Sequence, residues 1–140
     1  MATRQQSNLG NRFFASLIDY IVIGCFFLIY AYKFGEANEE GGYTVYGFKA
    51  LIPLGFWFLY LIVIESVFNA TVGHFVLGLK VIRTDYGRID VIHSLKRHLI
   101  DPIDFSFFGI PAMICIKNTE LNQRLGDLWA KTIIINDKEK

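Results

Sequence analysis

Two long apolar runs constrain this chain more than any other feature of its sequence. From Phe13 to Tyr32, 17 of 20 residues are apolar, and Asp19 is the only charged residue. From Ala50 to Phe68, 15 of 19 are apolar, and Glu65 is the only charged residue. A helix needs about 20 mostly apolar residues to cross the hydrocarbon core of a bilayer. A chain of 140 residues has too little other sequence to cover two such helices, so we predict membrane spans at about 13–32 and 50–68.

The composition agrees with this prediction. Hydrophobic residues make up 53% of the chain, above the roughly 45–50% usual for soluble domains. A net charge of +1 gives no bulk attraction to nucleic acid. Both cysteines, Cys25 and Cys115, lie inside apolar runs and build no disulfide framework. The chain is therefore expected to be a single membrane domain over 1–140, and not a nucleic-acid binder, a disordered segment or a disulfide-rich secreted protein.

A third apolar run is shorter and is interrupted by residues that weaken a helix. Ile103 to Ile116 has 10 apolar residues out of 14 and contains Gly109 and Pro111. Runs of this length are more often re-entrant or interfacial than spanning. We therefore predict a re-entrant or interfacial helical segment at about 99–116. Because broken backbone at membrane depth is tolerated only against protein or water, we expect it to pack against the two spans.

The distribution of basic residues provides an independent test of topology. If the third run does not cross, 12 Lys and Arg residues lie on one side, and only Lys33 and Lys49 lie on the other. If it does cross, the split is seven against seven. The positive-inside rule favours the asymmetric arrangement. This predicts a multi-pass protein of the bacterial cytoplasmic (inner) membrane with both termini in the cytoplasm.

The remaining sequence predicts small cytoplasmic elements. Leu79–Arg83 and Arg88–Val91 are β-type runs around Asp85-Tyr86-Gly87, which predicts a hairpin at about 79–91. Apolar residues at helical spacing in Val91–Asp101, with His93, Lys96 and Arg97 on the opposite side, predict an interfacial helix at an anionic membrane surface. A further short helix and strand are expected over 121–136. The predicted fold class is thus an α-helical membrane protein with two spans, a re-entrant segment, a cytoplasmic hairpin and a C-terminal strand.

Sequence motifs of enzymes, metal sites and cofactor sites are missing. Gly73–Lys80 resembles a phosphate-binding loop, but Leu79 stands where lysine must follow the second glycine. The sequence contains no His-Glu-x-x-His, no paired-cysteine metal signature and no Gly-x-Ser-x-Gly elbow. We therefore expect no catalytic residues, no metal and no cofactor.

Charged residues at membrane depth are the candidate functional site. An ionisable group in hydrocarbon costs at least about 2.5–3.5 kcal/mol, so it normally has a partner or a function. Arg12, Ser16 and Asp19 share one helical face, and we expect Arg12 to pair with Asp19. Glu65 falls in the same half of the bilayer, and Arg97, Asp101 and Asp104 are expected to support the site with Ser16. Either an ion-pair network that holds the helices together or a proton or cation relay would explain such a set.

Several short motifs in order resemble the RDD family of bacterial membrane proteins. They are Arg12-Phe13-x-Ala15-x-x-Ile18-Asp19, Glu65-Ser66, Thr71-x-Gly73, Gly78-Leu79-Lys80-Val81, Arg97, Gln123-Arg124-Leu125-Gly126-Asp127 and Thr132. Arg12, Asp19 and Asp127 match the arginine and the two aspartates that give the family its name. The family commonly has lysine where this chain has His74. The resemblance implies an integral membrane protein for which transport is suspected and cation/proton antiport is attributed to some members.

Two functional hypotheses follow. The chain is small for an autonomous carrier, which favours an accessory or scaffold subunit of a larger membrane assembly, in contact with lipid and with copies of itself or other membrane proteins. The alternative is a small oligomeric transporter, of which a cation/proton antiporter is the example that the family suggests, with Asp19 as the carrier of the proton or cation.

The predicted topology can be tested by cysteine labelling. In a chain without Cys25 and Cys115, Asn118→Cys should react with a membrane-impermeant reagent only after the membrane is opened. Glu39→Cys, in the predicted external loop, is the matched control and should react from outside. Labelling of Asn118→Cys from outside would show that the predicted orientation is wrong.

Overall fold

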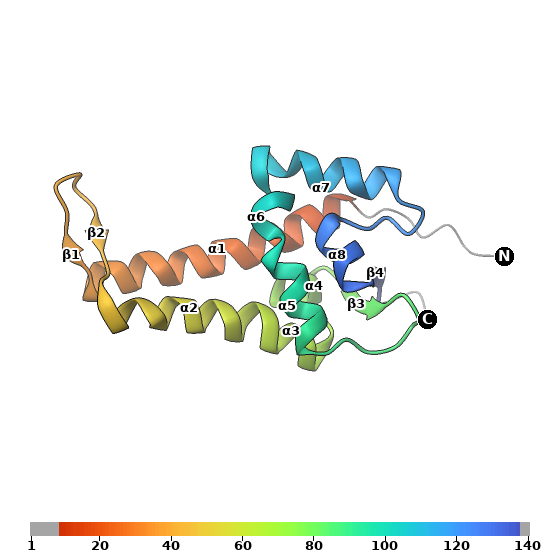
Figure 1. Ribbon diagram of the computed structural model, residues 1–140, viewed down its shortest axis with the longest axis horizontal. Coiled ribbons are helices and arrows are strands. Elements are labelled where there is room, and N and C mark those ends of the chain that lie inside the picture. The colour runs from red at the N-terminus through yellow and green to blue at the C-terminus, as the bar shows by residue number, and fades with distance from the viewer. Residues whose placement is uncertain (1–8, 138–140) are drawn as a thin grey trace.

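Two long helices form an antiparallel pair that projects from a cluster of shorter elements (Figure 1). The computed structural model describes residues 9–137. The first long helix, α1, covers Leu9–Phe34. The second helical stretch covers Gly47–Phe68 and consists of η1 (Gly47–Ala50), α2 (Leu51–Trp57), η2 (Phe58–Val63) and α3 (Ile64–Phe68). Both stretches are long and apolar enough to span a membrane, each with a mean hydropathy of 2.1.

The two long helices are joined at one end of the molecule by a small antiparallel sheet of β1 (Glu36–Ala37) and β2 (Tyr43–Thr44). They pack together through aromatic side chains, and the rings of Phe26 and Phe56 stack with centroids 3.8 Å apart. Each helix buries only 22% of its most apolar 18-residue window inside the described part of the chain. The pair therefore exposes most of its apolar surface.

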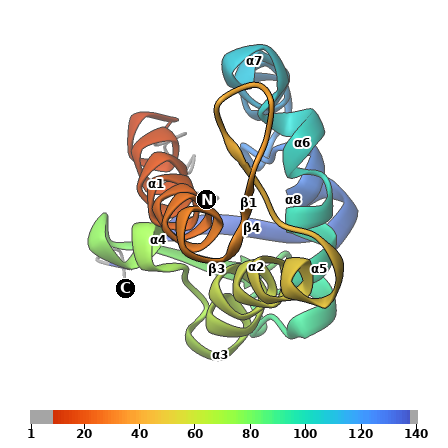
Figure 2. The same cartoon turned by 90° about the vertical axis from the view of Figure 1, so that its left-hand side faces the viewer.

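All other elements gather at the opposite end, where α1 begins (Figure 1). They are α4 (Val72–Val76), β3 (Leu79–Arg83), α5 (Val91–Leu99), α6 (Asp101–Asp104), α7 (Ser106–Asn118), α8 (Leu125–Ala130) and β4 (Thr132–Asn136). Viewed along the long helices, α1 lies on one side and α5 and α6 lie on the other, with α2 and α3 between them (Figure 2).

Local sequence explains where several of these elements begin and end. Asn69 adopts a left-handed conformation (φ 58°) and ends the second long helix. The Thr71 hydroxyl accepts a hydrogen bond from the backbone N–H of His74 at the start of α4. Asp90 caps α5 in the same way, accepting from the N–H of His93. Asn69 thus ends the second span, and Thr71 and Asp90 begin α4 and α5. Helix α4 then packs against α1, and α5 packs against the second span.

The predicted hairpin at 79–91 is wrong in its second strand. β3 forms as expected, but it pairs antiparallel with β4, in a register that sets Leu79 opposite Asn136 and Arg83 opposite Thr132. Residues 88–90 form no strand, because Asp90 already caps α5 and the Arg88 guanidinium donates to the carbonyl of Val67. The β-branched run of β4 supplies the apolar partner for β3 instead.

The third apolar run forms two helical pieces that meet at a sharp bend. The helical stretch Val91–Asp104 and α7 are inclined by 117° to each other. Just after the bend, Phe107, Phe108 and Gly109 have left-handed backbone angles, with φ of 48°, 60° and 82°. A bend of this kind is found both in broken spans and in re-entrant segments, so the re-entrant or interfacial placement stays a prediction.

The expected packing of this segment against both spans is only partly present. Pro102, Phe105 and Phe108 face α1 across a groove. Beyond the bend, Ile110 and Ile114 of α7 are exposed.

Two glycines permit the closest approaches between helices. A Cβ atom on Gly73 of α4 would lie 2.0 Å from the carbonyl oxygen of Ala15 in α1. A Cβ atom on Gly126 of α8 would lie 2.5 Å from the carbonyl oxygen of Arg97 in α5. Neither distance is sterically possible, so glycine is required at both crossings.

We predict that Gly73→Ala destabilises the fold by about 1–3 kcal/mol, because α4 must move away from α1. The matched control is Gly24→Ala, since a Cβ atom on Gly24 meets nothing within 4 Å. The free energy of unfolding in bicelles measures the difference. Equal stability of the two variants would contradict the close packing of α4 on α1.

Candidate functional site: a buried charged cluster

The guanidinium of Arg97 lies at the centre of a cluster of charged side chains from α1, α3, α5, α6 and α8. Its Nη2 atom is 3.4 Å from Oε1 of Glu65, and its Nη1 atom is 3.4 Å from Oδ1 of Asp127. All three side chains are fully buried. Arg97 therefore links the second span to the C-terminal helix α8 by charge.

Helix α5 presents its polar face to this cluster. Ser94, Arg97 and His98 are buried, and the Ser94 hydroxyl donates to Oε2 of Glu65 at 2.5 Å. Val91 and Ile92 on the same helix are exposed. Arg97 thus lies on the polar side of the helix, as the periodicity predicts, and this side faces the protein. Its contact with Glu65 agrees with its expected place among the residues that support the charged cluster.

Asp127 connects the cluster to the first span. Its Oδ2 atom lies 2.6 Å from Nη2 of Arg12 and accepts a hydrogen bond from the backbone N–H of Arg124. Arg12 also donates to the carbonyl of Asn122. Burial raises the pKa of Asp127, but Arg97, Arg12 and Arg124 outweigh burial and hold it below its usual value. Asp127 is therefore ionised, and it lies between three arginines.

A second group of contacts surrounds Asp101 at the start of α6. Nη1 of Arg124 lies 2.8 Å from Oδ1, and Nδ1 of His98 lies 2.7 Å from Oδ2. Tyr20 of α1 donates its hydroxyl to Oδ2 at 2.5 Å. Asp104, one turn later, accepts the backbone N–H groups of Leu125 and Gly126 at the start of α8.

His98 bridges the two parts of the cluster. Its Nε2 atom is 3.2 Å from Oε2 of Glu65, and its Nδ1 atom contacts Asp101. Burial alone would lower the pKa of His98, but the carboxylates of Asp101 and Glu65 outweigh burial and raise it to about 9. His98 is therefore positively charged at neutral pH. Its contribution to stability is complete below its unfolded pKa of about 6.5 and is lost as the pH rises through 9.

The charges in the cluster balance. Arg12, Arg97, Arg124 and His98 carry four positive charges, and four carboxylates oppose them: Glu65, Asp101, Asp104 and Asp127. Ions moved out of water cost several kcal/mol each unless partners compensate them. The balance explains how so many charged side chains can be buried together.

Asp19 lies apart from this cluster. Its carboxylate accepts hydrogen bonds from the Thr71 hydroxyl at 2.5 Å, the Gly73 N–H at 2.8 Å and the Tyr60 hydroxyl at 3.2 Å. The expected pairing of Arg12 with Asp19 is therefore wrong, since Arg12 binds Asp127. Both side chains leave α1 on the buried face, but neighbouring elements offer each a different partner.

The ring of His74 completes the surroundings of Asp19. Its Nδ1 atom lies 2.6 Å from the Thr71 hydroxyl and 3.9 Å from Oδ2 of Asp19. Burial, together with the nearby Arg97, lowers the pKa of His74 to about 3. His74 is therefore neutral at physiological pH and does not neutralise the Asp19 carboxylate.

The π-helical segment η2 allows the second span to serve both sites. Tyr60, inside η2, reaches Asp19, and Glu65 reaches Arg97. Tyr60 and Glu65 are five positions apart, which in an α-helix places their side chains on different faces. The wider π turn brings them closer to one face, and such turns occur often at functional sites.

The structure thus gathers most of the predicted polar residues into two neighbouring sites. Ser16 is the exception, because it lines the groove of about 540 Å³ between α1 and α6. Sequence reasoning did not assign six partners to these sites: the half-buried Tyr20 and the buried Tyr60, Thr71, His74, Ser94 and His98. Thr71 and His74 were visible in the family motif, but neither was expected to contact Asp19. Within residues 9–137, no group of three His, Cys, Asp or Glu residues could hold a metal ion.

The fold and this site define a class: a helical protein with two helices able to span a membrane and a buried arginine–carboxylate cluster at one end. A family model matches residues 7–131, nearly the whole chain, and its description is the RDD family. The chain belongs to the RDD family, as its sequence motifs indicated. No curated protein and no solved structure matches the chain.

We predict that Arg97→Met costs about 3–5 kcal/mol, because it leaves the carboxylates of Glu65 and Asp127 buried without their shared cation. Adding Glu65→Gln should restore part of this loss. Lys117→Met, at an exposed position, is the matched control and should change stability little. Unfolding in bicelles measures all three variants, and an Arg97→Met protein as stable as the control would contradict the central role of Arg97.

Proposed function

We propose that the protein is a non-catalytic module of the bacterial cytoplasmic membrane that forms a larger assembly with copies of itself or with other membrane proteins. The observation that carries this proposal is the shallow burial of its two long helices. Each leaves more than three quarters of its most apolar window uncovered within the chain. Such helices offer wide surfaces to other membrane helices as well as to lipid.

The charged cluster supports this role as a rigid frame. It connects α1 to α8 by an ion pair of 2.6 Å, and it connects the second span and α8 to Arg97 by two ion pairs of 3.4 Å. A frame of this kind fixes the angle at which the two long helices leave the cluster, and partners could then recognise a constant surface. The excess of basic residues on one side supports an orientation with both termini in the cytoplasm.

Purification in nanodiscs tests the proposal. The full chain, extracted without detergent, is expected to run as a homo-oligomer or with stoichiometric protein partners, as shown by native mass spectrometry. Gly24→Leu, on the face of α1 that is open within the chain, is expected to weaken the assembly but not the fold. A wild-type chain that is a monomer at all protein concentrations and carries no partner would contradict the proposal.

A second candidate function rests on Asp19. This carboxylate is held by three hydrogen-bond donors, and its nearest basic side chain is the neutral His74. A carboxylate without a fixed cation at membrane depth is suited to bind a proton or a cation reversibly. The candidate is an oligomeric cation/proton exchanger with Asp19 as the carrier.

Proteoliposomes distinguish the second candidate from the first. If Asp19 is the carrier, wild-type protein exchanges cations for protons across the vesicle membrane, and Asp19→Asn abolishes the exchange. Glu39→Gln is the control, since it changes an exposed carboxylate in the loop between β1 and β2. Wild-type protein that assembles but gives no exchange would eliminate the carrier.

A further inference from the structure

Helix α8 has the same inverted polarity as α5. Its buried residues are Gly126, Asp127 and Ala130, whereas Leu128 and Trp129 are 42% and 49% exposed. In a water-soluble protein, a helix at the surface turns its apolar stripe inward and its charged face to solvent. Here two separate helices do the reverse, which is the arrangement suited to an apolar surrounding.

The bend between them exposes still larger apolar side chains. Phe107 and Phe108 are 80% and 95% exposed. Their left-handed backbone is strained for residues that carry a side chain, and a favourable environment for the two exposed rings would offset this strain. Water does not stabilise exposed phenylalanine rings, whereas a hydrocarbon phase does.

We propose that the layer formed by α5, α6, α7 and α8 (residues 91–130, the C-terminal layer) lies within the cytoplasmic leaflet of the membrane, with its exposed apolar side chains against lipid acyl chains. This goes beyond the role in assembly and does not depend on it. The sequence alone predicted membrane contact for 91–116 but placed α8 among the cytoplasmic elements.

The shape of the exposed surface favours lipid over a second protein chain. Viewed along the long helices, α5, α6 and α7 follow one another around the side of the molecule (Figure 2). The exposed apolar residues therefore face several directions, and one rigid partner would cover only some of them. Fluid acyl chains cover all of them.

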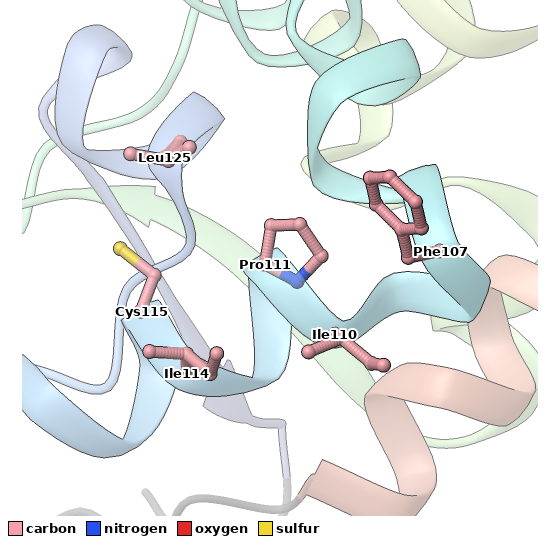
Figure 3. A pocket seen from close by; sticks show the side chains of 6 residues that line it. All are labelled: Phe107, Ile110, Pro111, Ile114, Cys115 and Leu125. Carbon is pink, nitrogen blue, oxygen red and sulfur yellow. The ribbon is translucent and has the colours of Figure 1, made fainter.

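The hollows on this surface fit the same occupant. An open pocket of about 580 Å³ is lined by Leu125 of α8 and by residues of α7, among them Pro111 and Cys115 (Figure 3). Its lining residues carry no charge. The groove beside α1 has mostly apolar and aromatic walls and joins the layer to the first span. Acyl chains can enter both.

One polar contact marks the edge of the layer. The ammonium of Lys96 lies 5.9 Å from the centroid of the Trp129 ring. Tryptophan and lysine together are typical of the membrane interface, where the ring sits at headgroup depth and the ammonium meets anionic lipid. We therefore place Trp129 near the headgroups and Phe108 deeper in the leaflet.

Tryptophan fluorescence tests this placement, because the chain has only two tryptophans. Trp57→Phe leaves Trp129 as the single tryptophan. In the Trp57→Phe protein, Trp129→Phe together with Phe108→Trp places the single tryptophan at the deeper position. In the same Trp57→Phe protein, Trp129→Phe together with Tyr86→Trp places it at a turn residue that is 79% exposed, which is the aqueous control. Each protein is reconstituted in phosphatidylcholine–phosphatidylglycerol vesicles, with or without brominated acyl chains.

Brominated acyl chains should quench the Phe108→Trp probe strongly and the shallower Trp129 probe to a smaller extent. Iodide in the buffer should quench Trp129 less than the aqueous control and should have little effect on the Phe108→Trp probe. The Tyr86→Trp probe should show the opposite pattern. The proposal is overturned if iodide quenches Trp129 as strongly as the control. It is equally overturned if neither quencher reaches Trp129 and cross-linking joins this surface to a second chain.

Discussion

The cost of placing charge in an apolar interior governs this structure. A buried guanidinium or carboxylate is tolerated only beside a partner, because the desolvation penalty is several kcal/mol per ion. Arg97 satisfies this condition for two carboxylates from distant parts of the chain, Glu65 and Asp127. The second span and α8 must therefore meet at α5, and the crossing of α5 and α8 at Gly126 permits the required distance.

The same constraint explains why the polarity of the short helices is inverted. Once α5 supplies the central cation, its polar face must turn inward and its apolar residues are left outside. Helix α8 follows because Asp127 is needed at the same point. Charge and hydrogen bonds thus hold α5 and α8 to the spans, and both helices turn apolar residues outward, which separates them from the surface helices of a water-soluble domain.

Much of this arrangement could be predicted from sequence, for physical reasons. Length and hydropathy identify the two long helices, and the charges inside apolar runs identify most of the site. The partner of each charge was not predictable, because Arg12 and Asp19 share a helical face yet bind Asp127 and Thr71, which lie far away in the chain. The hairpin prediction was wrong because β3 had two candidate partners, residues 88–91 and β4. The prediction chose the segment nearer in sequence, whereas β3 pairs with β4.

A double-mutant cycle between Arg12 and Asp127 tests the account most directly, since these residues join the first helix to α8 across 115 positions. The free energies of unfolding are measured in bicelles for wild type, Arg12→Gln, Asp127→Asn and the double variant. If paired charge holds the fold together, the double variant is less destabilised than the sum of the single variants, with a coupling energy of about 1–3 kcal/mol. Additive effects would contradict the account.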